Sequence, residues 1–167
     1  MKTLVQYIEH FSNWMAWLSA VVLGLMTVLI LAEIALWNLF EKTTLIADEY
    51  SAYGLAAIIF LGAGYCLKER GHIRITLVLG FLPKKLARVI TFIATGLTTA
   101  FMGYLWWYLL KMVQATVRYG STSGTLTNTP LWIPQTVMLI GAACFLLQLV
   151  ATTIKTYEAI GSGEEVV

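Results

Sequence analysis

Four long apolar runs, separated by short polar stretches, make up most of the chain. Charged residues are absent from positions 11–32, 50–67, 89–110 and 131–154. A helix needs about 20 residues to cross a hydrocarbon core of ~30 Å, and each run approaches or exceeds that length. Backbone polar groups in lipid must be satisfied within the segment, which favours helices for continuous apolar runs. The pattern predicts an all-α membrane protein with four transmembrane helices.

The residues that flank the runs set the expected bounds of the spans. We predict one integral membrane domain over 1–167, with spans at about 11–37, 48–67, 87–110 and 131–154. Beyond Leu110 the helical pattern continues with polar and apolar faces, so the third span is expected to extend past the membrane as an amphipathic stalk. Trp132 opens the fourth span and is expected to anchor it at the membrane surface.

Composition agrees with a chain surrounded mainly by lipid. Hydrophobic residues make up 59% of the sequence and charged residues 12%, about half the ~25% charged fraction that is typical of soluble domains. The formal net charge of +2 is too small for an electrostatic grip on nucleic acid. We therefore exclude a water-soluble domain and expect no nucleic-acid partner.

The basic residues predict how the chain is oriented. With four spans, both termini lie on the same side as the connection between spans two and three. Eight of the 11 lysines and arginines fall on that side, and the other three are Lys42, Lys111 and Arg118. The positive-inside rule therefore predicts cytoplasmic termini.

The connection between spans two and three is amphipathic rather than purely polar. Its apolar centre is too short to cross a membrane, so we expect an interfacial arm at about 72–83 on the cytoplasmic surface. The residues expected to form the arm or to contact phospholipid are Lys68, Arg70, Gly71, His72, Arg74, Lys84, Lys85 and Arg88.

Chemistry-bearing residues are sparse. Cys66 and Cys144 lie in apolar runs without a second cysteine nearby, and His10 and His72 are the only histidines. There is no nucleophile with a base, no metal-ligand cluster and no phosphate loop. Glu33 is about one turn inside the boundary of its span, and no proline lies centrally in a span. We expect no catalytic residue, no metal and no cofactor, and hence not an enzyme.

Small residues follow helical spacing in two of the spans. Gly54, Gly62 and Gly64 lie in the second span, and Gly96 and Gly103 in the third. In lipid, helices associate through close packing of such residues. We expect them at helix contacts, either within the chain or with another protein.

The segment ADEYSAYGLAAIIFLGAGYCLKERGHIRITLVLGFLPKKLARV, at 47–89, carries a recognisable order of motifs. An acidic pair opens the span, and it is followed by LGAGYCLK, a GHI turn and an LP step; TPLWIP opens the last span at 129–134. With the size and the four spans, this resembles the small membrane subunit of tripartite ATP-independent periplasmic (TRAP) transporters, the DctQ-like or Q subunit. That family more often has Glu at both acidic positions, where this chain has Asp48 and Glu49.

The resemblance implies a role in the bacterial inner membrane. A periplasmic binding protein would capture an organic acid, a large membrane subunit would move it with sodium ions, and this chain would brace the scaffold of the large subunit. Sialic acids, C4-dicarboxylates and other carboxylates are all open as substrates.

Asp48 and Glu49 have two interpretations. In the first turn of a helix, carboxylates interact favourably with the helix dipole, which is a purely local role. Alternatively, one of them, with an outer surface formed by Lys42, Arg118 and residues 121–129, meets the large subunit or the binding protein. The candidate partner-interface residues are Lys42, Asp48, Glu49, Arg118 and Trp132.

Two other functions stay open at this stage. A self-contained homo-oligomeric transporter or channel would need an ionisable residue at depth in each copy, for which Glu33 is the candidate. A cofactor-anchoring respiratory subunit would have to use His10 and His72. A large permease and an exported binding protein encoded beside this chain would favour the TRAP interpretation over the homo-oligomeric one.

Overall fold

The computed structural model of the chain describes residues 2–69 and 83–162. Four helices occur within these residues: α1 (Lys2–Phe40), α2 (Ala47–Lys68), α4 (Lys84–Tyr119) and α5 (Trp132–Ser162). Each contains a stretch long and apolar enough to cross a membrane. The predicted all-α architecture with four spanning helices is confirmed.

The helices are longer than the spans predicted from the apolar runs. Helix α1 has 39 residues and already begins at Lys2, whereas the predicted span begins at about residue 11. Helix α4 has 36 residues and continues past Leu110 to Tyr119, as the predicted stalk requires. At 1.5 Å per residue these helices are ~58 and ~54 Å long, well beyond a ~30 Å hydrocarbon core. Both therefore extend outside the membrane.

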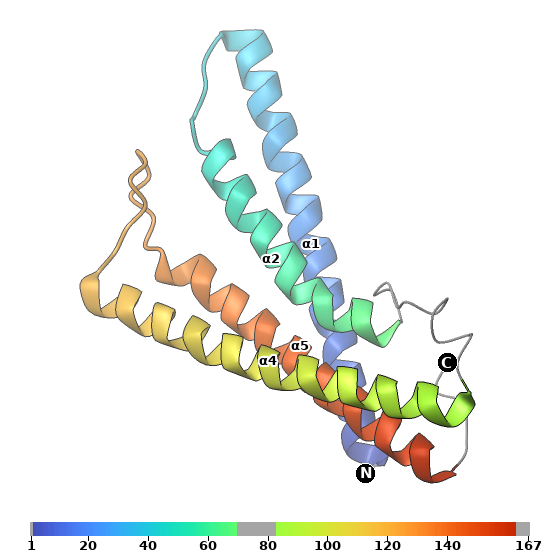
Figure 1. The fold of residues 1–167 in the computed structure, drawn as a ribbon. Helices are drawn as coiled ribbons and strands as arrows, with labels where there is room; N and C mark the ends of the chain where they lie inside the picture. The colour runs from blue at the N-terminus through green and yellow to red at the C-terminus, as the bar shows by residue number, and fades with distance from the viewer. Residues whose placement is uncertain (1, 70–82, 163–167) are drawn as a thin grey trace.

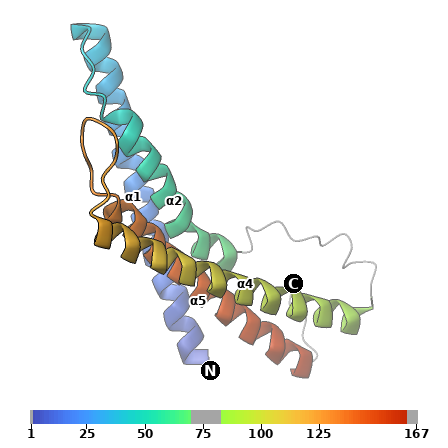
Figure 2. The same ribbon diagram turned by 60° about the vertical axis from the view of Figure 1, so that its left-hand side comes forward.

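Two antiparallel helix pairs make up the fold. Figure 1 shows α1 beside α2 and α4 beside α5, with both ends of the described chain at one end of the molecule. Helix α5 is central, because it packs against α2 and α4 and also contacts α1, whereas α4 packs mainly against α5. Figure 2 shows the segment between α4 and α5 beside the start of α2. Within the described residues, one face of α4 is thus left without a helix partner.

Glycines allow α2 to approach α1 and α5 closely. A Cβ added at Gly141 of α5 would lie 2.5 Å from the carbonyl carbon of Phe60, and one at Gly54 would lie 2.2 Å from the Sδ of Met26. At Gly64 it would lie 3.1 Å from the Sγ of Cys144. Helices packed this closely gain dispersion contacts between their atoms, which are a main source of helix association in lipid. The small residues of α2 are therefore used within the chain.

The small residues of α4 are used differently. A Cβ added at Gly96 or Gly103 would meet nothing within 4 Å. By contrast, the hydroxyls of Thr99 on α4 and Thr153 on α5 lie 3.0 Å apart and share a hydrogen bond. Helix α4 thus meets α5 through threonine and aromatic side chains, while its glycines are open.

The ends of the helices agree with their local sequence. Pro83 is the N-cap of α4, and its carbonyl accepts from the N–H groups of Leu86 and Ala87 at 2.9 and 3.0 Å. Gly120 closes α4 in the left-handed conformation at φ 60°, where its N–H reaches the last carbonyls. Glycine adopts this conformation without a Cβ penalty. The stalk therefore ends abruptly and the chain turns back.

Little of the molecule is buried by its own fold. Ser12, Leu61, Cys144 and Thr156 are the largest fully buried side chains among the described residues, and none of the most apolar stretch of α4 is buried. Large apolar side chains on all four helices are exposed instead. Such a surface is expected where lipid, rather than water, is the surrounding medium.

Much of the predicted interfacial arm lies outside the described residues. Arg70, Gly71, His72 and Arg74 belong to that part of the chain. Lys84, Lys85 and Arg88 lie in the first turns of α4 by their backbone. The arm and the cytoplasmic side of the termini stay predictions.

Candidate partner-binding surface

The segment between α4 and α5 folds as a short hairpin, which we call the outer hairpin (residues 120–131). The N–H of Ser123 donates to the carbonyl of Thr129 at 2.8 Å, and that of Leu131 donates to the carbonyl of Ser121 at 3.1 Å. Asn128 has a φ of 47°, a conformation that asparagine tolerates better than most residues. The segment between the two helices is thus an ordered element with its own backbone hydrogen bonds.

Glu49 attaches the outer hairpin to α2. One carboxylate oxygen accepts from the hydroxyls of both Thr125 and Thr127, and the other accepts from the hydroxyl of Tyr53 at 2.9 Å. Glu49 is 9% exposed even though it lies in the first turn of a helix. A carboxylate with three hydroxyl donors is well satisfied in such a site. Glu49 is therefore more than a local charge at a helix terminus, because it joins segments 76 and 78 residues apart.

A groove lies between the outer hairpin and the start of α2. Its volume is about 810 Å³, and its lining includes Asp48, Tyr53, Leu126 and Asn128 together with Glu49. Asp48 is exposed, and Leu126 is 80% exposed at the tip of the hairpin. The groove thus combines an exposed carboxylate with an exposed apolar side chain, which suits a protein partner carrying a cation beside an apolar patch.

The structure brings some of the predicted interface residues together and leaves others apart. Asp48 and Glu49 adjoin residues 121–129, as the outer-surface interpretation requires. Lys42, Arg118 and Trp132 are exposed but are absent from the lining of the groove. Sequence reasoning missed Thr125 and Thr127 as partners of Glu49, and the only available signal was the high density of hydroxyl residues in the hairpin.

Glu33 is held by the loop that joins α1 to α2. Its carboxylate accepts from the hydroxyl of Thr43, from the hydroxyl of Thr44 at 2.5 Å and from the Thr44 N–H at 2.8 Å. These contacts fasten the loop back onto α1. The one carboxylate within the first span therefore has a structural function in the chain.

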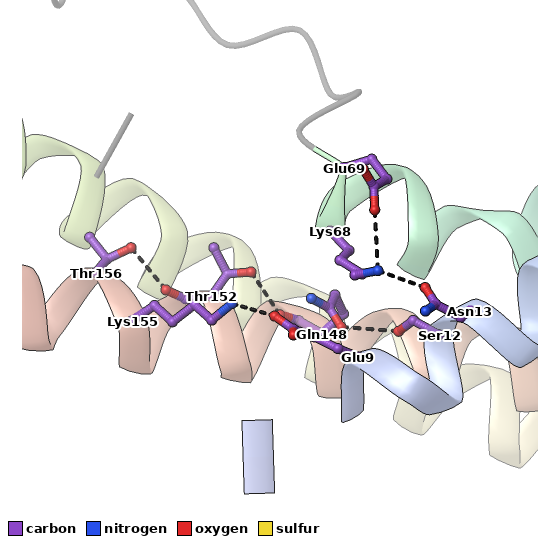
Figure 3. A network of polar contacts seen from close by, with 9 residues as sticks. All are labelled: Glu9, Ser12, Asn13, Lys68, Glu69, Gln148, Thr152, Lys155 and Thr156. Atoms are coloured by element: carbon purple, nitrogen blue, oxygen red, sulfur yellow. Dashed lines mark hydrogen bonds and ion pairs between the residues drawn. The ribbon is translucent and has the colours of Figure 1, made fainter. Parts of the chain in front are cut away.

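A polar cluster joins α1 to α5 near the other end of the molecule (Figure 3). The hydroxyl of Ser12 donates to the side-chain oxygen of Gln148 at 3.0 Å and lies 3.7 Å from the Sγ of Cys144. All three residues are at most 2% exposed. Hydrogen bonds of this kind between membrane helices are worth about 0.6–2 kcal/mol. The amide of Gln148 thus serves helix association.

Charged contacts surround this cluster. Lys155 of α5 pairs with Glu9 of α1, while the Nζ of Lys68 donates to the side-chain oxygen of Asn13 at 2.7 Å and lies 3.2 Å from Glu69 (Figure 3). Lys68, predicted as part of the arm, is therefore engaged by α1 at the point where α2 ends. These contacts extend the attachment of α1 beyond its apolar span.

A comparison with protein-family models decides the family. The model described as "Tripartite ATP-independent periplasmic transporters, DctQ component" matches residues 26–159. The chain belongs to this DctQ family. Comparisons with curated proteins and with solved structures gave no match.

The matched region includes the start of α2 and the outer hairpin, which together form the candidate partner-binding surface. It begins within α1 and ends within α5, so the DctQ region contains Glu33, the Glu49 contact and the whole outer hairpin. The chain is a small membrane component of a TRAP transporter, and four spanning helices make it a multi-pass membrane protein. The resemblance based on the acidic pair, the GHI turn and TPLWIP is confirmed. The DctQ family is a family of transporter components rather than of enzymes.

Proposed function

We propose that this DctQ component braces the scaffold of the large TRAP membrane subunit in the bacterial inner membrane. The large subunit would couple uptake of an organic acid to sodium ions, and a periplasmic binding protein would deliver the acid. Reconstituting the chain with and without these two partners tests the proposal.

The observation that carries this proposal is that the carboxylates near the spans are already hydrogen-bonded by other parts of the chain. Glu33 is bound by its own loop and Glu49 by the outer hairpin. Each described helix runs unbroken through its apolar stretch, whereas transporters expose ionisable groups or freed backbone groups at mid-membrane. A supporting role beside a cargo-carrying subunit fits these features.

The same observation weighs against a homo-oligomeric transporter or channel. That function would place Glu33 on a central pathway, where its carboxylate would have to be free for ions or solutes. Three hydrogen bonds from residues 43 and 44 occupy it instead. We therefore favour the supporting subunit.

The proposed orientation puts the outer hairpin in the periplasm and both termini in the cytoplasm. In a background without Cys66 and Cys144, single cysteines at Lys42 and Leu126 should react with an impermeant thiol reagent in intact cells, because both side chains are exposed. A cysteine at Tyr7, which is 75% exposed, should react only after the cells are opened. Labelling at position 7 in intact cells would show that the orientation is the reverse of the one proposed.

We further propose that the binding protein docks on the exposed outer charges. Asp48→Lys and Arg118→Glu should raise the concentration of binding protein needed for half-maximal uptake, because exposed charges at an interface chiefly set the association rate. Co-purification with the large subunit should be unchanged. Lys42 and Trp132 complete the proposed surface.

Salt provides the control for this docking prediction. Charges more than ~8–10 Å apart are screened at physiological ionic strength, so raising the salt should bring wild type and variants together. If both variants at low salt need the same concentration of binding protein for half-maximal uptake as wild type, the docking surface lies elsewhere.

A further inference from the structure

Lys111 occupies an unusual position on α4, at the end of the apolar run. Its Nζ lies 5.5 Å from the centre of the Trp107 ring and 5.7 Å from that of Tyr108. Both rings precede Lys111 by about one turn, so the side chain folds back toward the apolar run. A lysine at a span end more often extends its ammonium away toward water. Here the ammonium is held over two rings at the expected depth of the headgroups.

The surroundings of Lys111 are open to the outside of the molecule. Trp107 and Tyr108 are each 52% exposed, and Tyr104 is 60% exposed with its ring centre 4.8 Å from that of Tyr108. The neighbouring Trp106 instead turns inward and donates to the carbonyl of Leu139 on α5. Among the described residues, no carboxylate forms an ion pair with Lys111. Its charge is thus free for an anion from outside the chain.

An apolar stripe continues from this aromatic pair along the same face of α4. Ile93, Leu97 and Phe101 precede Tyr104 at helical spacing and are 61%, 72% and 64% exposed. Residues spaced three or four apart lie on one side of a helix. Lys111, with the hydroxyl of Tyr108 and the indole N–H of Trp107, therefore lies at one end of this apolar stripe. The arrangement matches the phosphate and the acyl chain of a lipid.

We propose that this face of α4 binds an anionic phospholipid, with its phosphate at Lys111, Trp107 and Tyr108 and an acyl chain along residues 93–104. Free phosphate has the same chemistry as the headgroup phosphate but would make no contact with the apolar stripe. A zwitterionic headgroup carries its own cation, which competes with Lys111 for the phosphate. The site is independent of the bracing role and goes beyond it, since it requires only the spanning helix.

Native mass spectrometry of the full chain, released from nanodiscs with equal phosphatidylglycerol and phosphatidylethanolamine, tests this site. One basic residue near an anionic headgroup corresponds to about fivefold enrichment of the anionic lipid. We expect the phosphatidylglycerol enrichment to be lower in Lys111→Gln than in wild type and unchanged in Lys111→Arg. Phospholipid held by the predicted cytoplasmic arm adds the same background to all three. Trp107→Leu should reduce the enrichment in part.

Lys42→Gln is the matched control, because Lys42 is also an exposed lysine with a predicted outer location but lies at the other helix pair. Its enrichment should equal that of wild type. Unchanged enrichment in Lys111→Gln would overturn the proposal, as would equal losses in the two glutamine variants. Release of the lipid by inorganic phosphate would assign the site to free phosphate instead.

Discussion

Gly141→Ala is expected to destabilise the protein strongly, although alanine is the better helix former. The new Cβ would lie 2.5–2.8 Å from backbone atoms of Phe60 and Leu61. Backbone at this distance cannot rotate away as a side chain can, so α2 and α5 must separate. Overpacking of this kind costs about 1–3 kcal/mol, and it acts on the central helix contact of the fold. The melting temperature of the purified chain should fall by several degrees.

Gly96→Ala is the matched control for this prediction. The same atom added to α4 meets nothing within 4 Å, so only helix propensity acts, and it favours alanine by about 1 kcal/mol. The two substitutions should therefore move the melting temperature in opposite directions. A similar fall for both would mean that α2 and α5 are not in close backbone contact.

Glu49→Ala should release the outer hairpin from α2. The substitution removes the acceptor for the hydroxyls of Tyr53, Thr125 and Thr127. All three hydroxyl donors lose their shared charged acceptor at once, and hydrogen bonds to a charged group are stronger than those between neutral groups. Amide exchange in residues 120–131 should accelerate at least about tenfold, as measured by hydrogen–deuterium exchange mass spectrometry.

Asp48→Asn provides the comparison for this result. Asp48 is adjacent and acidic but exposed, and its side chain does not hold the hairpin. Exchange in the hairpin should stay at the wild-type rate. Equal acceleration in the two variants would indicate a general effect of charge at the start of α2, and no acceleration in Glu49→Ala would remove its proposed structural role.

The length of the apolar runs was sufficient to predict the four spans, and the helical pattern of polar and apolar residues past Leu110 predicted the continuation of α4. Helix α2, Ala47–Lys68, follows the predicted span of 48–67 closely, because polar residues bound its apolar run on both sides. Helix α1 begins before the span predicted at about 11–37. Residues 2–10 mix charged and polar side chains with apolar ones, and they are helical where Glu9 pairs with Lys155 of α5.

Contacts between distant segments could not be read from the sequence. Hydroxyls such as those of Thr125 and Thr127 can pair with any carboxylate, so nothing local connects them to Glu49. Small-residue spacing indicated close packing for both α2 and α4, but among the described residues the α2 glycines have close neighbours and those of α4 have none within 4 Å. Helix pairing in lipid depends on three-dimensional fit rather than on a pattern along one helix.

Sodium-driven uptake by proteoliposomes tests the bracing role most directly. The substrate would first be chosen by screening sialic acids and C4-dicarboxylates against the binding protein. Vesicles with all three components should accumulate it under an inward sodium gradient, while vesicles with this chain alone should stay at background. Vesicles with only the large subunit and the binding protein should also lose uptake. Uptake by the isolated chain, or full uptake without it, would contradict the account.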